Sequence, residues 1–107
     1  MSPQISLSFT VLLFQESEWW VAQCLEYDIA AQGKTVAEVK DSFIKTLAGQ
    51  IVVDVRHGNK PLEGIQRAPR YYWDKMENAD LRSTMKPIYL PEEVSSVRAT
   101  AEFALAA

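Results

Sequence analysis

The stretch Ile5-Ser6-Leu7-Ser8-Phe9-Thr10-Val11-Leu12-Leu13-Phe14 decides the fold, because apolar and polar residues alternate along most of it. Successive side chains of a β-strand point to opposite faces, so this alternation predicts a strand with one buried face. Near the end of the stretch, Leu12 and Phe14 add apolar side chains to the other face. We therefore expect both faces of this strand to be covered at that end.

A second strand is expected after the polar turn at residues 15–18. Its residues suit a pleated surface: Trp19-Trp20-Val21-Ala22-Gln23-Cys24-Leu25. The short connection predicts an antiparallel hairpin. Adjacent strand residues face opposite ways, so Trp19 and Trp20 should lie on opposite faces of the sheet. A brief third strand is expected at residues 29–32, after the acidic kink Glu26-Tyr27-Asp28.

A long helix should follow, because Thr35 and Glu38 have the spacing of a capping box, in which each side chain accepts a hydrogen bond from the other's backbone N–H. The apolar stripe at helical spacing consists of Val36, Val39, Phe43 and Leu47. Residues 51–55 are apolar in nearly all directions, which fits an enclosed helix end or a strand. We favour a helix that ends near His57, with Gly58 as its left-handed cap.

The second half of the chain has weaker signals. Residues 58–68 read as a loop, and Pro69 suits the first turn of a short helix that reaches about Ala79. A last helix is expected from Pro91, with an apolar stripe at Val94, Val97, Ala101 and Leu105. The sequence thus predicts one α+β domain. Residues 1–57 form a three-stranded antiparallel sheet packed by one long helix, and residues 58–107 form a helical or irregular extension on the same core.

The charge of the chain is uneven along its length. Residues 1–57 hold seven acidic and four basic residues, whereas residues 58–107 hold seven of each, so the net charge of −3 lies entirely in the first half. This distribution favours a basic partner there and gives no general attraction to nucleic acid or to anionic membranes. A single cysteine, Cys24, and the lack of a long apolar run make the cytoplasm the default location.

Between residues 20 and 39, six residues follow one another in a characteristic order: Val21, Ala22, Cys24, Gly33, Thr35 and Glu38. This order resembles the HicB-like antitoxin family over roughly residues 7–55. The resemblance implies a partial RNase H-like fold without nuclease activity, and a small, basic, RNA-cleaving toxin as the partner. The family's proline-containing kink is replaced here by Leu25-Glu26-Tyr27-Asp28, and residues 58–107 carry no complete DNA-binding module. DNA is therefore not expected as a partner.

No enzyme chemistry is expected. A nuclease of the RNase H type needs converging carboxylates that hold two Mg²⁺ ions, whereas the acids here lie in a turn and a kink. One Cys and one His cannot complete a zinc site, and Cys24 and His57 lie in different kinds of element. We expect no catalytic residue, metal or cofactor. The basic and aromatic residues of residues 60–75 leave a small RNA-binding module as a distant alternative.

The partner surface is expected at the edge formed by Trp19, Glu26, Tyr27 and Asp28, with Glu16 and Glu18 at the adjacent turn and Tyr27 as the anchor. Apolar side chains that one helix cannot cover predict an oligomer interface, in a dimer as the first choice, at Leu12, Phe14 and Trp20. The alternative to an antitoxin is a stand-alone oligomeric domain of the same fold, with a structural or regulatory role and no toxin.

Overall fold

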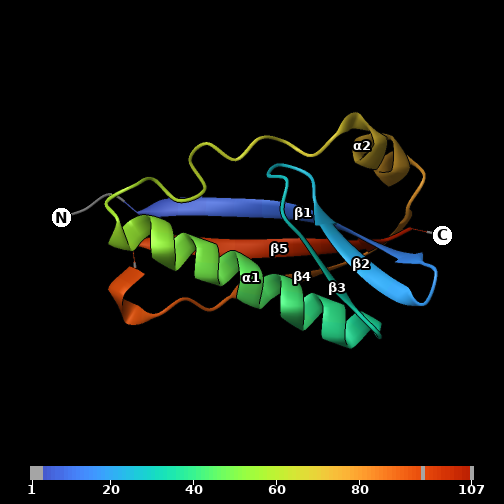
Figure 1. Cartoon of the computed structure of the whole chain (residues 1–107), viewed down its shortest axis with the longest axis horizontal. Helices are drawn as coiled ribbons and strands as arrows, with labels where there is room; N and C mark the ends of the chain where they lie inside the picture. Colours follow the sequence, from blue (N-terminus) through green and yellow to red (C-terminus); the bar gives the residue numbers. More distant parts are fainter. Residues whose placement is uncertain (1–3, 95, 107) are drawn as a thin grey trace.

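The computed structural model describes residues 4–94 and 96–106, without the side chains of residues 80–86 and 93 (Figure 1). The elements in chain order are β1 (Ile5–Glu16), β2 (Trp19–Cys24), β3 (Ala30–Gly33), α1 (Val36–Arg56), α2 (Arg70–Glu77), β4 (Asp80–Ile88), the short 3-10 helix η1 (Glu92–Val94) and β5 (Val97–Leu105). Among the described residues, no helix combines the length and the apolar character that crossing a bilayer requires.

The strands form one mixed five-stranded sheet in the order β3-β2-β1-β5-β4. The predicted antiparallel β1–β2–β3 unit is present, so the α+β class is confirmed. The predicted size of the sheet is wrong, because β4 and β5 add two strands on the other side of β1. β5 runs parallel to β1, with Ile5 opposite Val97 and Leu13 opposite Leu105. β4 pairs antiparallel with β5 at the edge.

The predicted helix from Pro91 is therefore also wrong: among the described residues after Pro91, only the short η1 is helical, and a strand follows it. The apolar residues of β5 fit the spacing of a helix as well as that of a strand. Val97, Ala101 and Leu105 are four residues apart, and the buried Ala99 and Phe103 lie midway between them, which gives a spacing of two. Of the residues between these, Arg98 and Glu102 are exposed, whereas Thr100 is partly buried and Ala104 is buried. Pairing with β1 on one side and β4 on the other decides in favour of the strand.

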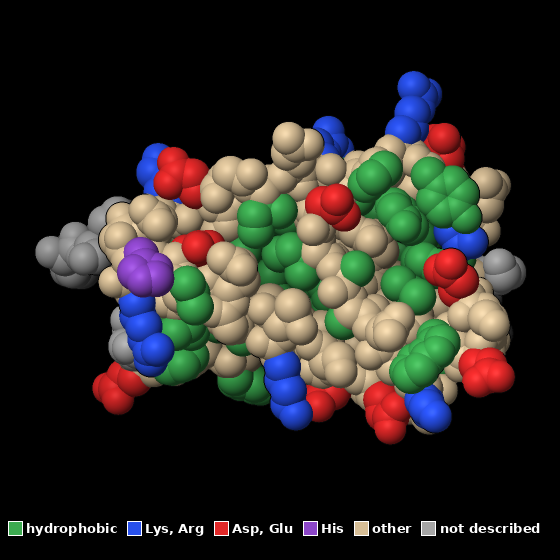
Figure 2. Space-filling view, viewed as in Figure 1, with side chains coloured by type: hydrophobic (Ala, Val, Ile, Leu, Met, Phe, Trp, Pro, Cys, Tyr) green, Lys and Arg blue, Asp and Glu red, His purple; other side chains and the backbone are tan. Residues whose placement is uncertain are grey.

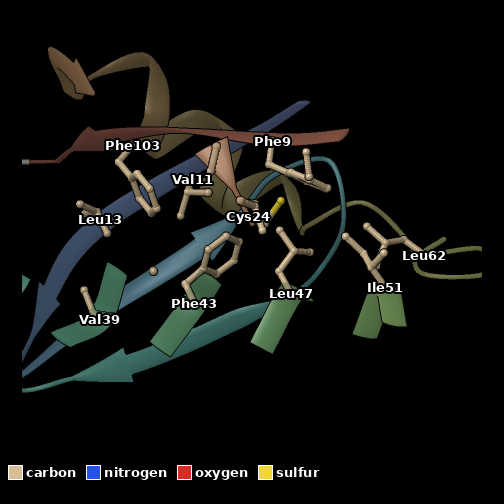
Figure 3. Close-up of a cluster of buried hydrophobic side chains, with 14 of the residues drawn as sticks. Phe9, Val11, Leu13, Cys24, Val39, Phe43, Leu47, Ile51, Leu62 and Phe103 are labelled. Carbon is tan, nitrogen blue, oxygen red and sulfur yellow. The ribbon is translucent and has the colours of Figure 1, made fainter. Parts of the chain in front are cut away.

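Helix α1 covers one face of the sheet and forms the main core there (Figure 3). Its buried residues Val39, Phe43, Leu47 and Ile51 face β1, β2 and β5, and the rings of Phe43 and Phe103 meet edge to face at 6.2 Å. The helix continues through residues 51–55, as favoured from the sequence.

The two ends of α1 match the expected caps with one correction. The Oγ of Thr35 accepts the N–H of Glu38 at 3.1 Å, as predicted. The Glu38 carboxylate accepts the N–H of Lys34 at 2.9 Å, one residue before the predicted partner. Gly58 has a φ of 74° and follows the helix end in the left-handed region.

The opposite face of the sheet is covered at one end by α2. Leu12 is fully buried and Phe14 is 6% exposed, and the Phe14 ring lies 5.9 Å from the ring of Tyr72 in α2. The expected cover over this end of β1 thus comes from the chain itself. Near the start of β1, the same face carries the exposed Ser6 and Ser8, which are polar and need no cover.

The loop between α1 and α2 is anchored at several points, and these anchors position α2. Asp54 accepts the N–H of Leu62 at 2.7 Å, and Leu62 is buried in the core despite a φ of 63°. Further on, the N–H of Ala68 donates to the carbonyl of Leu25 at 3.0 Å. α2 begins two residues after this bond, so the start of the helix is held close to the end of β2.

Replacement of Phe103 tests the central place of β5. Phe103→Ala should lower the free energy of unfolding by about 3–5 kcal/mol, because it leaves a cavity between α1 and the sheet. Glu102→Ala is the matched control, since this neighbouring side chain is exposed on the other face and should change stability by less than about 0.5 kcal/mol. Chemical denaturation monitored by circular dichroism measures both. Equal stability of the two variants would contradict the buried position of β5.

Candidate functional site

The predicted partner-binding residues fall at the two ends of β2. Glu16, Glu18 and Trp19 lie at the β1–β2 turn, whereas Glu26, Tyr27 and Asp28 follow the last residue of the strand, Cys24. A strand rises about 3.3 Å per residue, so the six residues of β2 separate the two groups by roughly 17–20 Å. The structure does not bring all six into one cluster.

At the kink, Glu26 makes an internal contact. β2 pairs with β1 only from Val11 to Glu16, and the next backbone N–H of β1, that of Thr10, donates to Glu26 Oε1 at 2.7 Å. The carboxylate therefore replaces a strand partner where β2 turns away. Glu26 contributes to the fold, which reduces its availability to another protein.

Tyr27 and Asp28 are also tied to the fold. The Tyr27 ring is partly buried and packs on Phe9 at 5.7 Å between centroids. Asp28 is exposed, yet its Oδ1 accepts Nε2 of the buried Gln23 at 2.9 Å, and its N–H donates to Gln66 at 2.7 Å. A substitution of Tyr27 would therefore disturb packing as well as any partner contact.

Cys24, between these groups, is fully buried, and burial raises the pKa of its thiol to about 12. The thiol stays protonated at neutral pH, and a thiol is a poor nucleophile compared with a thiolate. Among the described residues, no three His, Cys, Asp or Glu side chains are grouped so that they could hold a metal ion.

The turn end of the hairpin is open to solvent. Glu16 and Glu18 are exposed and form no ion pair with a described residue, and Trp19 is 40% exposed. Trp19 lies directly opposite Glu16 in the β1–β2 pair, so the two side chains share one face. Lys34 places its Nζ 5.5 Å from the centre of the Trp19 ring. Trp20 packs instead against the core on the α1 side, as expected for adjacent strand residues.

A pocket of about 260 Å³ lies between this end of β1 and α2. Its walls are Phe14, Gln15, Glu16, Tyr71, Tyr72 and Lys75. Figure 2 shows hydrophobic side chains gathered at the end of the molecule where α2 and the hairpin lie, with charged side chains beside them. We define the hairpin–α2 patch as Phe14, Glu16, Glu18, Trp19, Tyr71, Tyr72 and Lys75.

The patch includes residues that the sequence assigned to different roles and others that it did not assign. Phe14 and Leu12 were expected in an oligomer interface, but α2 of the same chain covers Phe14, and Leu12 is fully buried within the chain. The surplus apolar surface that motivated a dimer is thus smaller than expected. The contact of Lys75 with Phe14 and the place of Tyr71 in the same pocket were missed. The spacing of four residues, which puts Tyr71 and Lys75 on one side of α2, is the signal that could have found them.

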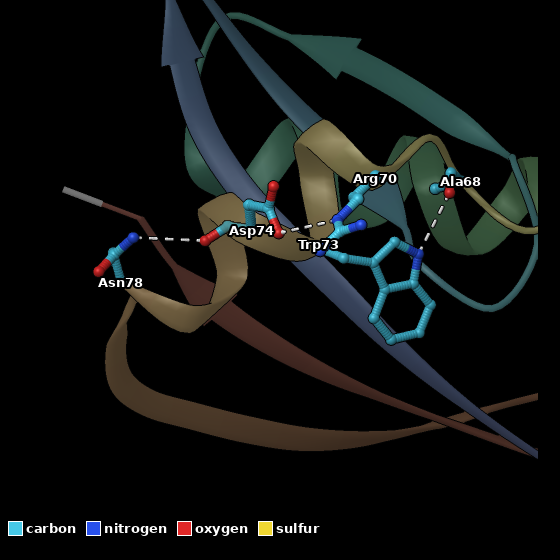
Figure 4. A network of polar contacts seen from close by, with 5 residues as sticks. All are labelled: Ala68, Arg70, Trp73, Asp74 and Asn78. Atoms are coloured by element: carbon cyan, nitrogen blue, oxygen red, sulfur yellow. Dashed lines mark hydrogen bonds and ion pairs between the residues drawn. The ribbon is translucent and has the colours of Figure 1, made fainter.

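A second pocket, of about 220 Å³, lies on another side of α2 and is lined by Arg67, Ala68, Arg70 and Trp73. The guanidinium of Arg67 stacks 4.1 Å from the centre of the Trp73 ring. The Nε1 of Trp73 donates to the carbonyl of Ala68 at 3.2 Å (Figure 4). Arg70 faces Asp74 at 3.8 Å, and both side chains are largely exposed. The pocket is basic and aromatic, unlike the hairpin–α2 patch with its two acids.

Removal of the Glu26 carboxylate tests its internal role. Glu26→Ala should destabilise the protein by about 1–3 kcal/mol, because the partly buried N–H of Thr10 loses its acceptor. Glu26→Gln keeps a carbonyl oxygen at that place and should cost less. Glu18→Ala serves as the control, since Glu18 is exposed in the turn. Thermal unfolding ranks the three variants, and a Glu26→Ala variant as stable as the control would show that the contact is dispensable.

No protein-family model, curated protein or solved structure matches the chain. The resemblance of residues 7–55 to the HicB-like family therefore stays a hypothesis.

Proposed function

We propose that this protein is a non-catalytic binding protein of the HicB-like antitoxin type, which occludes a small basic partner that cleaves RNA. The observation that carries the proposal is the hairpin–α2 patch, where Trp19 and Tyr71 are exposed and a pocket is lined by Phe14, Tyr72 and Glu16 among others. Glu18 is exposed in the adjacent turn, and neither acid forms an ion pair with a described residue. Tryptophan and tyrosine dominate the binding energy of many protein interfaces.

A basic partner is favoured by the position of the acids. Glu16 and Glu18 are exposed beside Trp19, and a protein that cleaves RNA must itself be basic to hold phosphates. Complementary charge speeds the encounter and fixes its orientation, while the aromatic rings supply buried area. The binding surface proposed here is thus the turn end of the hairpin, and the kink residues Glu26 and Tyr27 are left to their internal contacts.

Capture from the native cell with the tagged protein, followed by titration of the captured partner, tests this proposal. Trp19→Ala should weaken binding by about 2 kcal/mol, roughly a thirtyfold rise in Kd. The double variant Glu16→Gln, Glu18→Gln should slow association, and high salt should remove that difference. Glu102→Gln, which changes an exposed acid on β5, should leave binding unchanged.

If the partner binds the hairpin variants with unchanged affinity but does not bind the Asp28→Asn variant, the interface lies at the kink and the proposed surface is wrong. If RNA is found in the captured material and the Arg67→Gln variant no longer binds it, the alternative of a small RNA-binding module is favoured. That alternative rests on the guanidinium that is already stacked on Trp73 beside Arg70.

A stand-alone oligomeric domain is the other alternative. Ile5, Val53 and Tyr89 are 38%, 46% and 85% exposed, and the start of β1 and the end of α1 lie at the same end of the molecule (Figure 1). Light scattering of the purified protein at micromolar concentration should show a dimer if this surface associates. A monomer that does not change on concentration would contradict both the dimer and this alternative.

A further inference from the structure

The pocket of the hairpin–α2 patch has a cation in its wall, because Lys75 is one of the residues that line it. The Nζ of Lys75 lies 4.9 Å from the centre of the Phe14 ring and 5.8 Å from that of Tyr71. Tyr72 completes the group, because its ring stands 5.9 Å from Phe14 and meets Tyr71 edge to face at 5.1 Å. Two aromatic rings, one from β1 and one from α2, thus lie within 6 Å of one ammonium group, and the ring of Tyr72 packs against both of them.

Among the lysines whose side chains the structure describes, Lys75 lies over two aromatic rings, whereas Lys34 and Lys40 each lie over one. On α1, Lys45 forms an ion pair with Asp41 and is 76% exposed, as is common for lysines on a helix surface. Lys75 is partly buried and is turned over the rings, although α2 is exposed along much of its length. The faces of aromatic rings carry negative electrostatic potential, which attracts a cation placed above them.

The wall of the pocket adds a full negative charge. Glu16 lines the same pocket as Lys75, and it forms no ion pair with a described residue. The ring faces and this carboxylate all favour a positive group, and a space of about 260 Å³ is open beside Lys75. An anionic or purely apolar ligand would find the Glu16 carboxylate unfavourable.

We infer that the pocket formed by Phe14, Tyr71 and Tyr72 is a receptor for a cationic side chain, and that Lys75 covers the Phe14 and Tyr71 rings as an internal competitor until that side chain arrives. Arginine is the preferred occupant, because its planar guanidinium stacks on aromatic rings and binds a carboxylate through two N–H groups. The inference rests on the proposed function in one respect, namely that the side chain belongs to a basic protein. The chemistry of the pocket does not depend on the proposed function.

The competition has a measurable consequence. A ligand that must displace Lys75 binds more weakly, in proportion to the fraction of time for which the pocket is open. Substitution of Lys75 by an uncharged residue should therefore strengthen the binding of an external cation, whereas loss of a ring should weaken it. A purely structural lysine would show the opposite, with no gain in binding when it is removed.

The experiment uses the full chain and methylguanidinium as the probe, with the aromatic NMR signals of Tyr71 and Tyr72 as the readout. Lys75→Met should bind the probe about threefold more tightly than the wild type, and Tyr71→Ala about threefold more weakly. Tyr71 is 63% exposed, so its loss should leave the fold intact, which circular dichroism checks. Lys40→Met is the matched control, because Lys40 lies on α1, outside the pocket, and its Nζ is 5.5 Å from the centre of the Phe103 ring.

Tyrosine signals that do not respond to the probe, or equal affinities of Lys75→Met and the wild type, would overturn the inference. The titration is independent of any partner, so it also separates the two proposals. If methylguanidinium binds as described and no basic protein is captured from the cell, the pocket stands and the proposed function fails. If a basic partner is captured and Tyr71→Ala and Lys75→Met leave its affinity unchanged, the function stands and the role of the pocket is refuted.

Discussion

The parallel pairing of β1 with β5 is the constraint on which the rest of the structure depends. It joins nine consecutive residue pairs, from Ile5 and Val97 to Leu13 and Leu105, in the middle of the sheet. The combined surface of the two strands receives α1, as the contact of Phe43 with Phe103 shows. β1 also continues beyond this pairing to Glu16. Its last residues are therefore available to the β2 hairpin and, on the other face, to α2.

Elements with strong local signals were predictable from the sequence. The alternation of β1, the aromatic β2 and the cap at Thr35 each depend on residues close together in the chain, and all three were found where expected. β5 was not predictable in this way, because its apolar residues satisfy a helical period as well as a strand period. Its partner in the sheet lies about 90 residues away. Long-range pairing overrode a local pattern that allowed both structures.

The candidate site was predictable in part. The exposure of Glu16 and Glu18 follows from their place in the turn predicted at residues 15–18, and Trp19 begins the strand predicted after it. The role of Glu26 did not follow, since only the structure reveals that β2 leaves the N–H of Thr10 without a strand partner. The pocket could not be derived either. It needs Phe14 and Tyr71 from elements more than 50 residues apart, brought together by the loop that Asp54 and Leu62 anchor.

The parallel β1–β5 pair also determines when this protein can fold in the cell. β1 is synthesised before β5, which pairs with one of its two edges and begins at Val97. That edge of β1 therefore has no partner strand while about 90 further residues are synthesised. At ribosomal rates this takes roughly 5 to 20 seconds. During that time the apolar β1 and its hairpin are exposed as an unpaired edge, the kind of surface that chaperones shield and proteases attack. The cellular level of the protein should thus depend on how quickly each new chain is completed.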